Sequence, residues 1–144
     1  MNLLFLILSA CNLGDVSLNE VVAVSEDSDD WIELHNIGAE DMDLVGWGLA
    51  DDLDAGSIWI FPAVYLPAGG FLRIWADGGA EGDGLHASFR LARDGEEVFL
   101  LSPSGRIVDS VEFPAMEPGE SYGRLPDGTG SWMILSPSPE EGNG

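Results

Sequence analysis

Residues 31–37, Trp-Ile-Glu-Leu-His-Asn-Ile, form the stretch of the chain that decides its fold. Ile32 and Leu34 alternate with Glu33 and His35, so an extended backbone points the apolar pair to one side and the polar pair to the other. This period of two residues predicts a β-strand that buries one face. Because a single strand cannot bury a face alone, we expect partner strands in the neighbouring sequence.

Further stretches rich in Val, Ile, Trp and Phe lie on both sides of this segment, separated by Gly, Pro, Asp and Ser. Asp-Gly and Pro-x-Gly turns over 93–95, 102–105 and 126–130 supply the backbone angles of tight connections. No stretch keeps a helical period over three turns. The predicted strands are 17–24, 31–37, 46–49, 57–61, 71–76, 86–91, 97–101, 107–113, 121–125 and 131–135. This pattern predicts an all-β sandwich.

The composition supports one folded, acidic domain. The chain has 144 residues, of which 45% are hydrophobic, and it includes five Trp and six Phe, enough apolar material for a core. Its formal charge is −21, with five Arg and no Lys. That charge excludes a nucleic-acid binder, which needs cationic side chains for phosphates, and it disfavours adsorption to anionic lipid.

The first eleven residues, MNLLFLILSAC, differ from the rest. The apolar run 3–8 is shorter than the roughly 20 residues of a membrane-spanning helix and is followed by small residues, as in an export signal. Residues 8–11, Leu-Ser-Ala-Cys, resemble the bacterial lipobox, in which the signal is cut before the cysteine and the cysteine is acylated. Cys11 is the sole cysteine of the chain, so no internal disulfide can form.

This resemblance implies a signal peptide over 1–10, a short linker over 11–16, and a membrane anchor through lipid on Cys11. Lipoproteins that lack Asp after the cysteine usually go to the outer membrane, and here Asn12 follows. We therefore expect an exported protein of a bacterial cell envelope, at the outer membrane or the cell surface. The alternatives are an ordinary secretory signal with a chance cysteine and a mis-assigned start codon.

The body of the chain carries an ordered set of short motifs over 30–36, 43–49, 66–72, 85–91, 95–98, 108–111 and 121–128. Together these motifs resemble the lamin tail domain over almost the whole body of the chain. The resemblance implies an immunoglobulin-like β-sandwich of two antiparallel sheets over 17–139, followed by a disordered tail over 140–144. In lamins the module is a non-catalytic interaction surface, and its chromatin role does not suit a charge of −21.

Enzymatic chemistry finds little support in the sequence. His35 and His86 are the only imidazole bases, and neither lies near a nucleophile-elbow pattern. Two histidines and one cysteine reserved for an anchor do not suggest a zinc site. We expect no enzyme and no resident cofactor.

Calcium is the stronger chemical alternative, because loops of this chain concentrate carboxylates, the ligands that calcium prefers. The loop after residue 50 fails the EF-hand pattern, and a near match to the calcium-binding nonapeptide over 78–85 has Glu81 where Gly is required. Solvated acidic loops would explain the same residues. The candidate calcium ligands are Asp51, Asp52, Asp54, Asp77, Glu81 and Asp83.

Trp31, Glu33 and His35 share the polar side of the decisive strand, and we expect this side at the surface as a possible recognition patch. The sequence thus predicts a monomeric, lipid-anchored interaction or scaffold module with a protein or glycan partner. A calcium-dependent adhesion or glycan-binding domain is the alternative. A hydrolase accessory domain is a third reading.

Overall fold

The computed structural model describes residues 13–23 and 29–143. It is built from strands, with two single-turn 3-10 helices at Leu13–Asp15 and Ala55–Ser57. The strands are β1 (Val16–Val22), β2 (Trp31–Asn36), β3 (Met42–Asp43), β4 (Gly48–Ala50), β5 (Trp59–Ile60), β6 (Tyr65–Leu66), β7 (Phe71–Ala76), β8 (Leu85–Ala87), β9 (Gly95–Leu101), β10 (Ile107–Pro114), β11 (Ser121–Leu125) and β12 (Ser131–Leu135).

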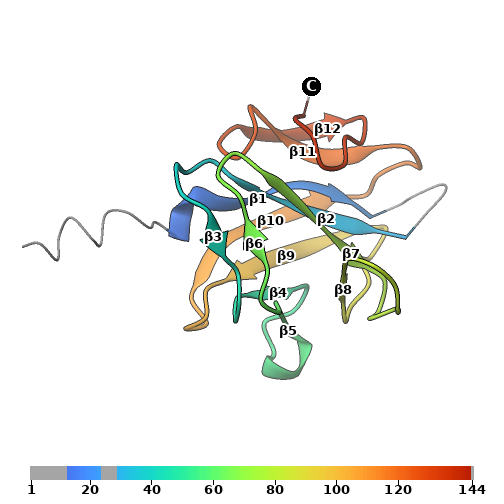
Figure 1. The fold of residues 1–144 in the computed structure, drawn as a ribbon. Helices are drawn as coiled ribbons and strands as arrows, with labels where there is room; N and C mark the ends of the chain where they lie inside the picture. Colours follow the sequence, from blue (N-terminus) through green and yellow to red (C-terminus); the bar gives the residue numbers. More distant parts are fainter. Residues whose placement is uncertain (1–12, 24–28, 144) are drawn as a thin grey trace, which may run out of the picture.

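The strands form two packed sheets and one small ribbon (Figure 1). The larger sheet has six strands in the order β12-β11-β1-β2-β7-β8, and the facing sheet has four in the order β10-β9-β4-β5. The ribbon pairs β3 with β6. The predicted immunoglobulin-like sandwich is confirmed, with one refinement: β8 runs parallel to β7, while the other strand pairs are antiparallel.

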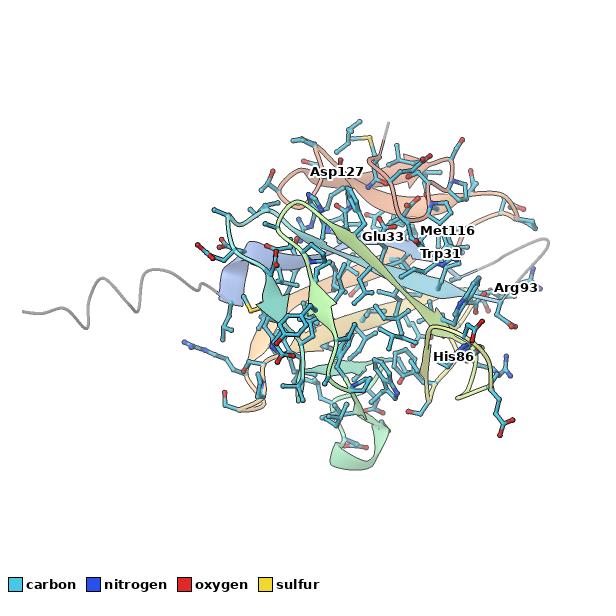
Figure 2. The ribbon with its side chains drawn as sticks, in the orientation of Figure 1. Trp31, Glu33, His86, Arg93, Met116 and Asp127 are labelled. Carbon is cyan, nitrogen blue, oxygen red and sulfur yellow. The ribbon has the colours of Figure 1, made fainter. Side chains whose placement is uncertain are left out.

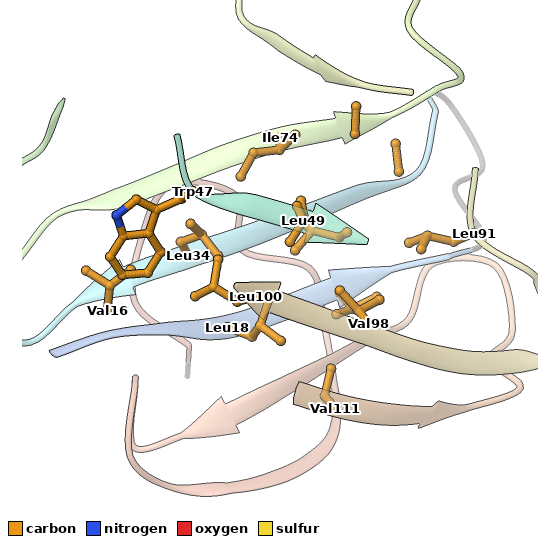
Figure 3. Close-up of a cluster of buried hydrophobic side chains, with 14 of the residues drawn as sticks. Val16, Leu18, Leu34, Trp47, Leu49, Ile74, Leu91, Val98, Leu100 and Val111 are labelled. Carbon is orange, nitrogen blue, oxygen red and sulfur yellow. The ribbon is translucent and has the colours of Figure 1, made fainter. Parts of the chain in front are cut away.

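The core lies between the two sheets, as Figure 3 shows. Ile32 and Leu34 of the decisive strand are fully buried in it, as their alternation predicts. Trp47 closes one end of the same cluster at 1% exposure. Burial of such side chains is the main stabilising contribution to a sandwich. The facing residues include Leu18 and Ile74 from the six-stranded sheet and Leu49, Val98, Leu100 and Val111 from the four-stranded sheet.

One ion pair ties the two sheets together. Nη2 of Arg124, on β11, donates to both carboxylate oxygens of Asp109, on β10, at 3.0 Å each. Nε of Arg124 donates to the carbonyl of Leu18 at 2.9 Å, and the amide of Leu18 donates to Asp109 at 2.9 Å. The guanidinium also stacks on the ring of Trp132, 4.8 Å from its centroid. Both charged side chains are therefore held with their partners at the sheet margin.

The last described residues differ from the prediction. A disordered tail was expected over 140–144, yet Asn143 is 5% exposed and its Nδ2 donates to the carbonyls of Asn19 and Arg124 at 3.1 and 2.8 Å. Residues 140–143 therefore lie against the six-stranded sheet. The polar composition of this segment gave no sign of this contact, because its partners are polar backbone and side-chain groups, some of them, such as Asn19, more than one hundred residues away.

No helix in the described ranges is long and apolar enough to cross a membrane.

Candidate functional site

Three rows of paired residues cross the outer side of the six-stranded sheet, facing away from the core. In the middle row Glu20 of β1 pairs with Glu33 of β2, and Glu33 pairs with Arg73 of β7. On one side of it Trp31 pairs with Trp75, and on the other His35 pairs with Phe71. We call this surface the outer face; its residues are Glu20, Trp31, Glu33, His35, Phe71, Arg73, Trp75 and His86.

The expectation that Trp31, Glu33 and His35 lie at the surface is wrong. Their exposed fractions are 4%, 0% and 9%. The alternation correctly places the three on one side of β2, but other parts of the chain lie over that side. Residues 137–143, which we call the strap, contact Glu33 through the amide of Glu140, while the ring of Phe71 stacks on His35 and the guanidinium of Arg73 lies 6.0 Å from the ring centroid of Trp31. Figure 2 shows Trp31 and Glu33 on β2 with Asp127 of the β11–β12 turn above them.

The strap contacts both glutamates of the middle row. The amide and hydroxyl of Ser138 donate to the carboxylate of Glu20, at 3.0 and 3.1 Å. The amide of Glu140 donates to Oε2 of Glu33 at 2.5 Å. Two facing carboxylates are thus capped by donors from one short segment, which offsets part of the cost of their burial.

These contacts do not restore ordinary acidity to the two glutamates. Burial, together with the nearby carboxylates of Glu20 and Asp127, raises the pKa of Glu33 to about 8. Burial also raises the pKa of Glu20 above its usual range. A buried pair of like charges disfavours double ionisation, so Glu33 holds a proton at neutral pH that an exposed glutamate would release.

An amide network anchors the end of the strap beside the glutamates. Nδ2 of Asn19 donates to Asp127 at 3.0 Å and to Glu33 at 3.4 Å. The amide of Asn143 also donates to Asp127, at 2.9 Å, and its Oδ1 lies 2.8 Å from the hydroxyl oxygen of Ser138. The β11–β12 turn and the strap are therefore bound to β1 by the same polar groups.

Arg73 lies between the strap and a pocket. Its guanidinium is 4.3 Å from the ring centroid of Trp75 and 6.0 Å from that of Trp31, and it pairs with the carboxylate of Glu140 at 3.3 Å. The adjoining pocket has a volume of about 380 Å³ and a largely apolar lining. We call it the Arg73 pocket; it is lined by Pro62, Ala63, Val64, Phe71, Leu72, Arg73, Gly84, Leu85 and Glu140.

The two histidines hold structural positions. Nδ1 of His35 lies 2.9 Å from the carbonyl of Gly70, and its ring stacks on Phe71 with centroids 4.1 Å apart. Nδ1 of His86 lies 2.6 Å from Oδ2 of Asp77, and its Nε2 lies 2.9 Å from the carbonyl of Asp83. Hydrogen bonds to Asp77 and Asp83 raise the pKa of His86, because both acceptors favour the doubly protonated ring. Both imidazole rings therefore hydrogen-bond to loop residues, His35 to Gly70 and His86 to Asp77 and Asp83.

The six candidate calcium ligands do not assemble into one site. Asp51, Asp52 and Asp54 follow β4, whereas Asp77, Glu81 and Asp83 lie between β7 and β8. Within residues 13–23 and 29–143, no group of three or more His, Cys, Asp or Glu side chains could hold a metal ion. Asp77 is already committed to His86 and to the amide of Ala80. The candidate lipidation residue, Cys11, lies outside the described residues.

The comparison with protein families agrees with this architecture. The Lamin Tail Domain family matches residues 10–115. The chain belongs to the lamin tail domain family. This is a family of non-catalytic, immunoglobulin-like folds. The search of curated proteins found no match.

The matched segment of this lamin tail domain ends before β11, β12 and the strap. Asp127 and Asn143, which hold the strap, therefore lie beyond it, whereas Glu20, Glu33 and Arg73 lie within it. Sequence reasoning overlooked Glu20 and Arg73. For Arg73 the available signal was the period of two, which puts it on the side of its strand opposite Ile74. For Glu20 the same period gives the wrong side, that of the core residue Leu18, because the register of β1 shifts between Leu18 and Glu20.

Proposed function

We propose that this lamin tail domain is a non-catalytic interaction module that a lipid on Cys11 holds at a bacterial cell envelope. The proposed partner is a protein, and the proposed contact is the Arg73 pocket. One observation carries this choice: an apolar recess of about 380 Å³ has a single cation at its wall, on a fold whose histidines are engaged in loop contacts. Such a recess suits the side chain of a partner more than a reaction.

Exposed apolar side chains close in sequence to the pocket lining support a protein partner. Tyr65, next to the lining residue Val64, is 66% exposed, and Ile60 is 56% exposed. Exposed aromatic and aliphatic side chains are typical of the anchoring part of a protein interface. A charge of −21 favours encounter with a basic partner and keeps copies of the chain apart.

The contact is tested with two matched variants. Val64→Asp puts a charge in the pocket wall, while Val45→Asp puts the same charge at a site that is 50% exposed and outside the pocket. After crosslinking in envelopes of the native host, we expect Val64→Asp to lose the crosslinked partner and Val45→Asp to keep it. Equal crosslinking by both variants would exclude the pocket as the contact.

The anchor is tested separately by mass spectrometry of the mature N-terminus and by fractionation. We expect an acylated Cys11 as the first residue, and release of Cys11→Ser from the membrane fraction. A retained Met1 or an unmodified Cys11 contradicts the anchor and leaves the pocket experiment unaffected.

A further inference from the structure

The strap is held almost wholly by polar contacts. Ser138 is half-buried, Pro139, Glu140, Glu141 and Gly142 are exposed, and Asn143 is the one buried side chain in this part of the described chain. A segment that buries no apolar side chain belongs to the low end of local stability. It can therefore leave the sheet without unfolding the core.

Backbone strain adds to this lability. Glu140 has a φ of +62°, and it is the only residue other than glycine with positive φ among those that the structure describes. Left-handed backbone is unfavourable for an ordinary residue, because its Cβ lies too close to the following carbonyl oxygen. Glu140 adopts it where its amide bonds to Glu33 and its carboxylate pairs with Arg73. These two contacts balance the strain, and weakening either one favours release.

We propose that the strap is a releasable cover that closes the outer face in acid and opens it in alkaline solution, and that it thereby changes the charged wall of the Arg73 pocket. The pocket's role rests on the proposed function, whereas the motion of the strap does not. Closure seats Glu140 in the pocket wall beside Arg73, and opening removes that carboxylate and uncovers Glu20 and Glu33.

The direction of the pH dependence follows from the buried pair. In the closed structure, burial raises the pKa of Glu33 from 4.5 to about 8, although the hydrogen bond from the Glu140 amide lowers it. Opening returns Glu33 to water and removes that burial, so the closed form binds the proton more tightly than the open form. Closure is therefore fully favoured below about pH 4.5, weakens as the pH rises toward 8, and stays weak above 8. Glu20 acts in the same direction.

Other charged groups near the pair do not reverse this direction. The carboxylate of Asp127 raises the pKa of both glutamates. The cation of Arg73 is paired with Glu140, and that of Arg124 with Asp109. The charged and titratable groups around the pair are Glu20, Glu33 and His35 on β1 and β2, Arg73 on β7, Arg124 on β11, Asp127 in the β11–β12 turn, and Glu140 and Glu141 on the strap.

Amide hydrogen exchange of the full chain tests the proposal without any partner. The amides of Ser138, Glu140 and Asn143 report closure, once their rates are divided by those of an unstructured peptide of the same sequence at the same pH. We expect their protection to fall about tenfold or more between pH 5.5 and pH 9, while amides of β9 stay protected. Protection that does not change with pH would overturn the proposal.

The variants assign the effect to the pair. Glu33→Gln keeps an acceptor for the amide of Glu140 but cannot ionise, so we expect a strap that stays closed at pH 9. Glu112→Gln removes the same charge from an exposed site on β10, and should behave as the unmodified chain does. If Glu33→Gln fails to fold, Glu20→Gln takes its place. Equal opening of the Gln variant and the unmodified chain would contradict the proposal.

Discussion

Asp109 is a single residue on which several contacts between the sheets depend. It accepts from the guanidinium of Arg124 and from the amide of Leu18, and its side chain is only 17% exposed. Removing one partner of such a pair leaves the other charge without compensation in a poorly solvated place. The effect of a substitution here should therefore exceed the loss of one hydrogen bond.

We expect Asp109→Ala to lower the free energy of unfolding by about 2–4 kcal/mol, because it leaves the Arg124 guanidinium and the Leu18 amide without their acceptor. Urea unfolding at neutral pH measures this loss in the free energy of unfolding. Glu112→Ala, at an exposed position of the same strand, should change the free energy by less than about 0.5 kcal/mol. A loss for Asp109→Ala no larger than for this control would show that the ion pair contributes little.

Residue by residue, the sequence predicts which side of β2 a side chain takes but not what covers that side. Ile32 and Leu34 point into the core as expected. Glu33 is also fully buried, because its cover comes from Glu140, 107 positions later. Period-two patterns contain no information about such distant polar contacts. The same limit applies to Asp77, whose pairing with His86 depends on the path of a loop.

At the scale of elements, the turns explain where sequence reasoning succeeded. The turns over 102–105 and 126–130 join β9 to β10 and β11 to β12, as hairpins. The strands β3 and β6 were not predicted, because two residues each are too few to show a period. Leu66, which lies outside the predicted strands, belongs to β6 and is fully buried.

Gly95 begins β9, and its neighbours leave no room for a side chain. Its φ is +101°, and a Cβ there would lie 2.6 Å from the carbonyl oxygen of Phe113. Gly105, in the β9–β10 turn, has a φ of +86° with open space around it. The two glycines share the unusual backbone and differ in the space available.

We therefore expect Gly105→Ala to cost about 1 kcal/mol of stability from backbone strain alone, and Gly95→Ala at least about 1–2 kcal/mol more because β10 must move. Thermal or urea unfolding of the two variants measures the difference. Equal losses would mean that the β9–β10 pairing yields to the added methyl group at no cost.

For the whole molecule, the charge of −21 determines how dissolved divalent cations should affect stability. Diffuse binding of a divalent cation to so acidic a surface relieves repulsion whichever metal is used. A built site would instead prefer calcium over magnesium, because calcium takes more oxygens at longer distances. The two metals therefore separate general screening from a specific site.

We expect calcium and magnesium at equal millimolar concentration to shift the melting temperature equally, to within about 1 °C, since the described residues form no group of three metal ligands. Differential scanning fluorimetry with each chloride salt, and with chelator, measures it. A rise of several degrees with calcium alone would support the adhesion alternative.

The place of β1 between β2 and β11 affects how a nascent chain can fold. Pairing with β2 is available early, but Glu20 meets Gly123 only after synthesis of on the order of a hundred further residues. Until then one edge of β1 presents unpaired backbone N–H and C=O groups, to which another polypeptide can hydrogen-bond. A ribosome that stopped before residue 121 would thus release a fragment prone to stick to its neighbours, and a holdase that kept the chain extended until β11 emerged would prevent this.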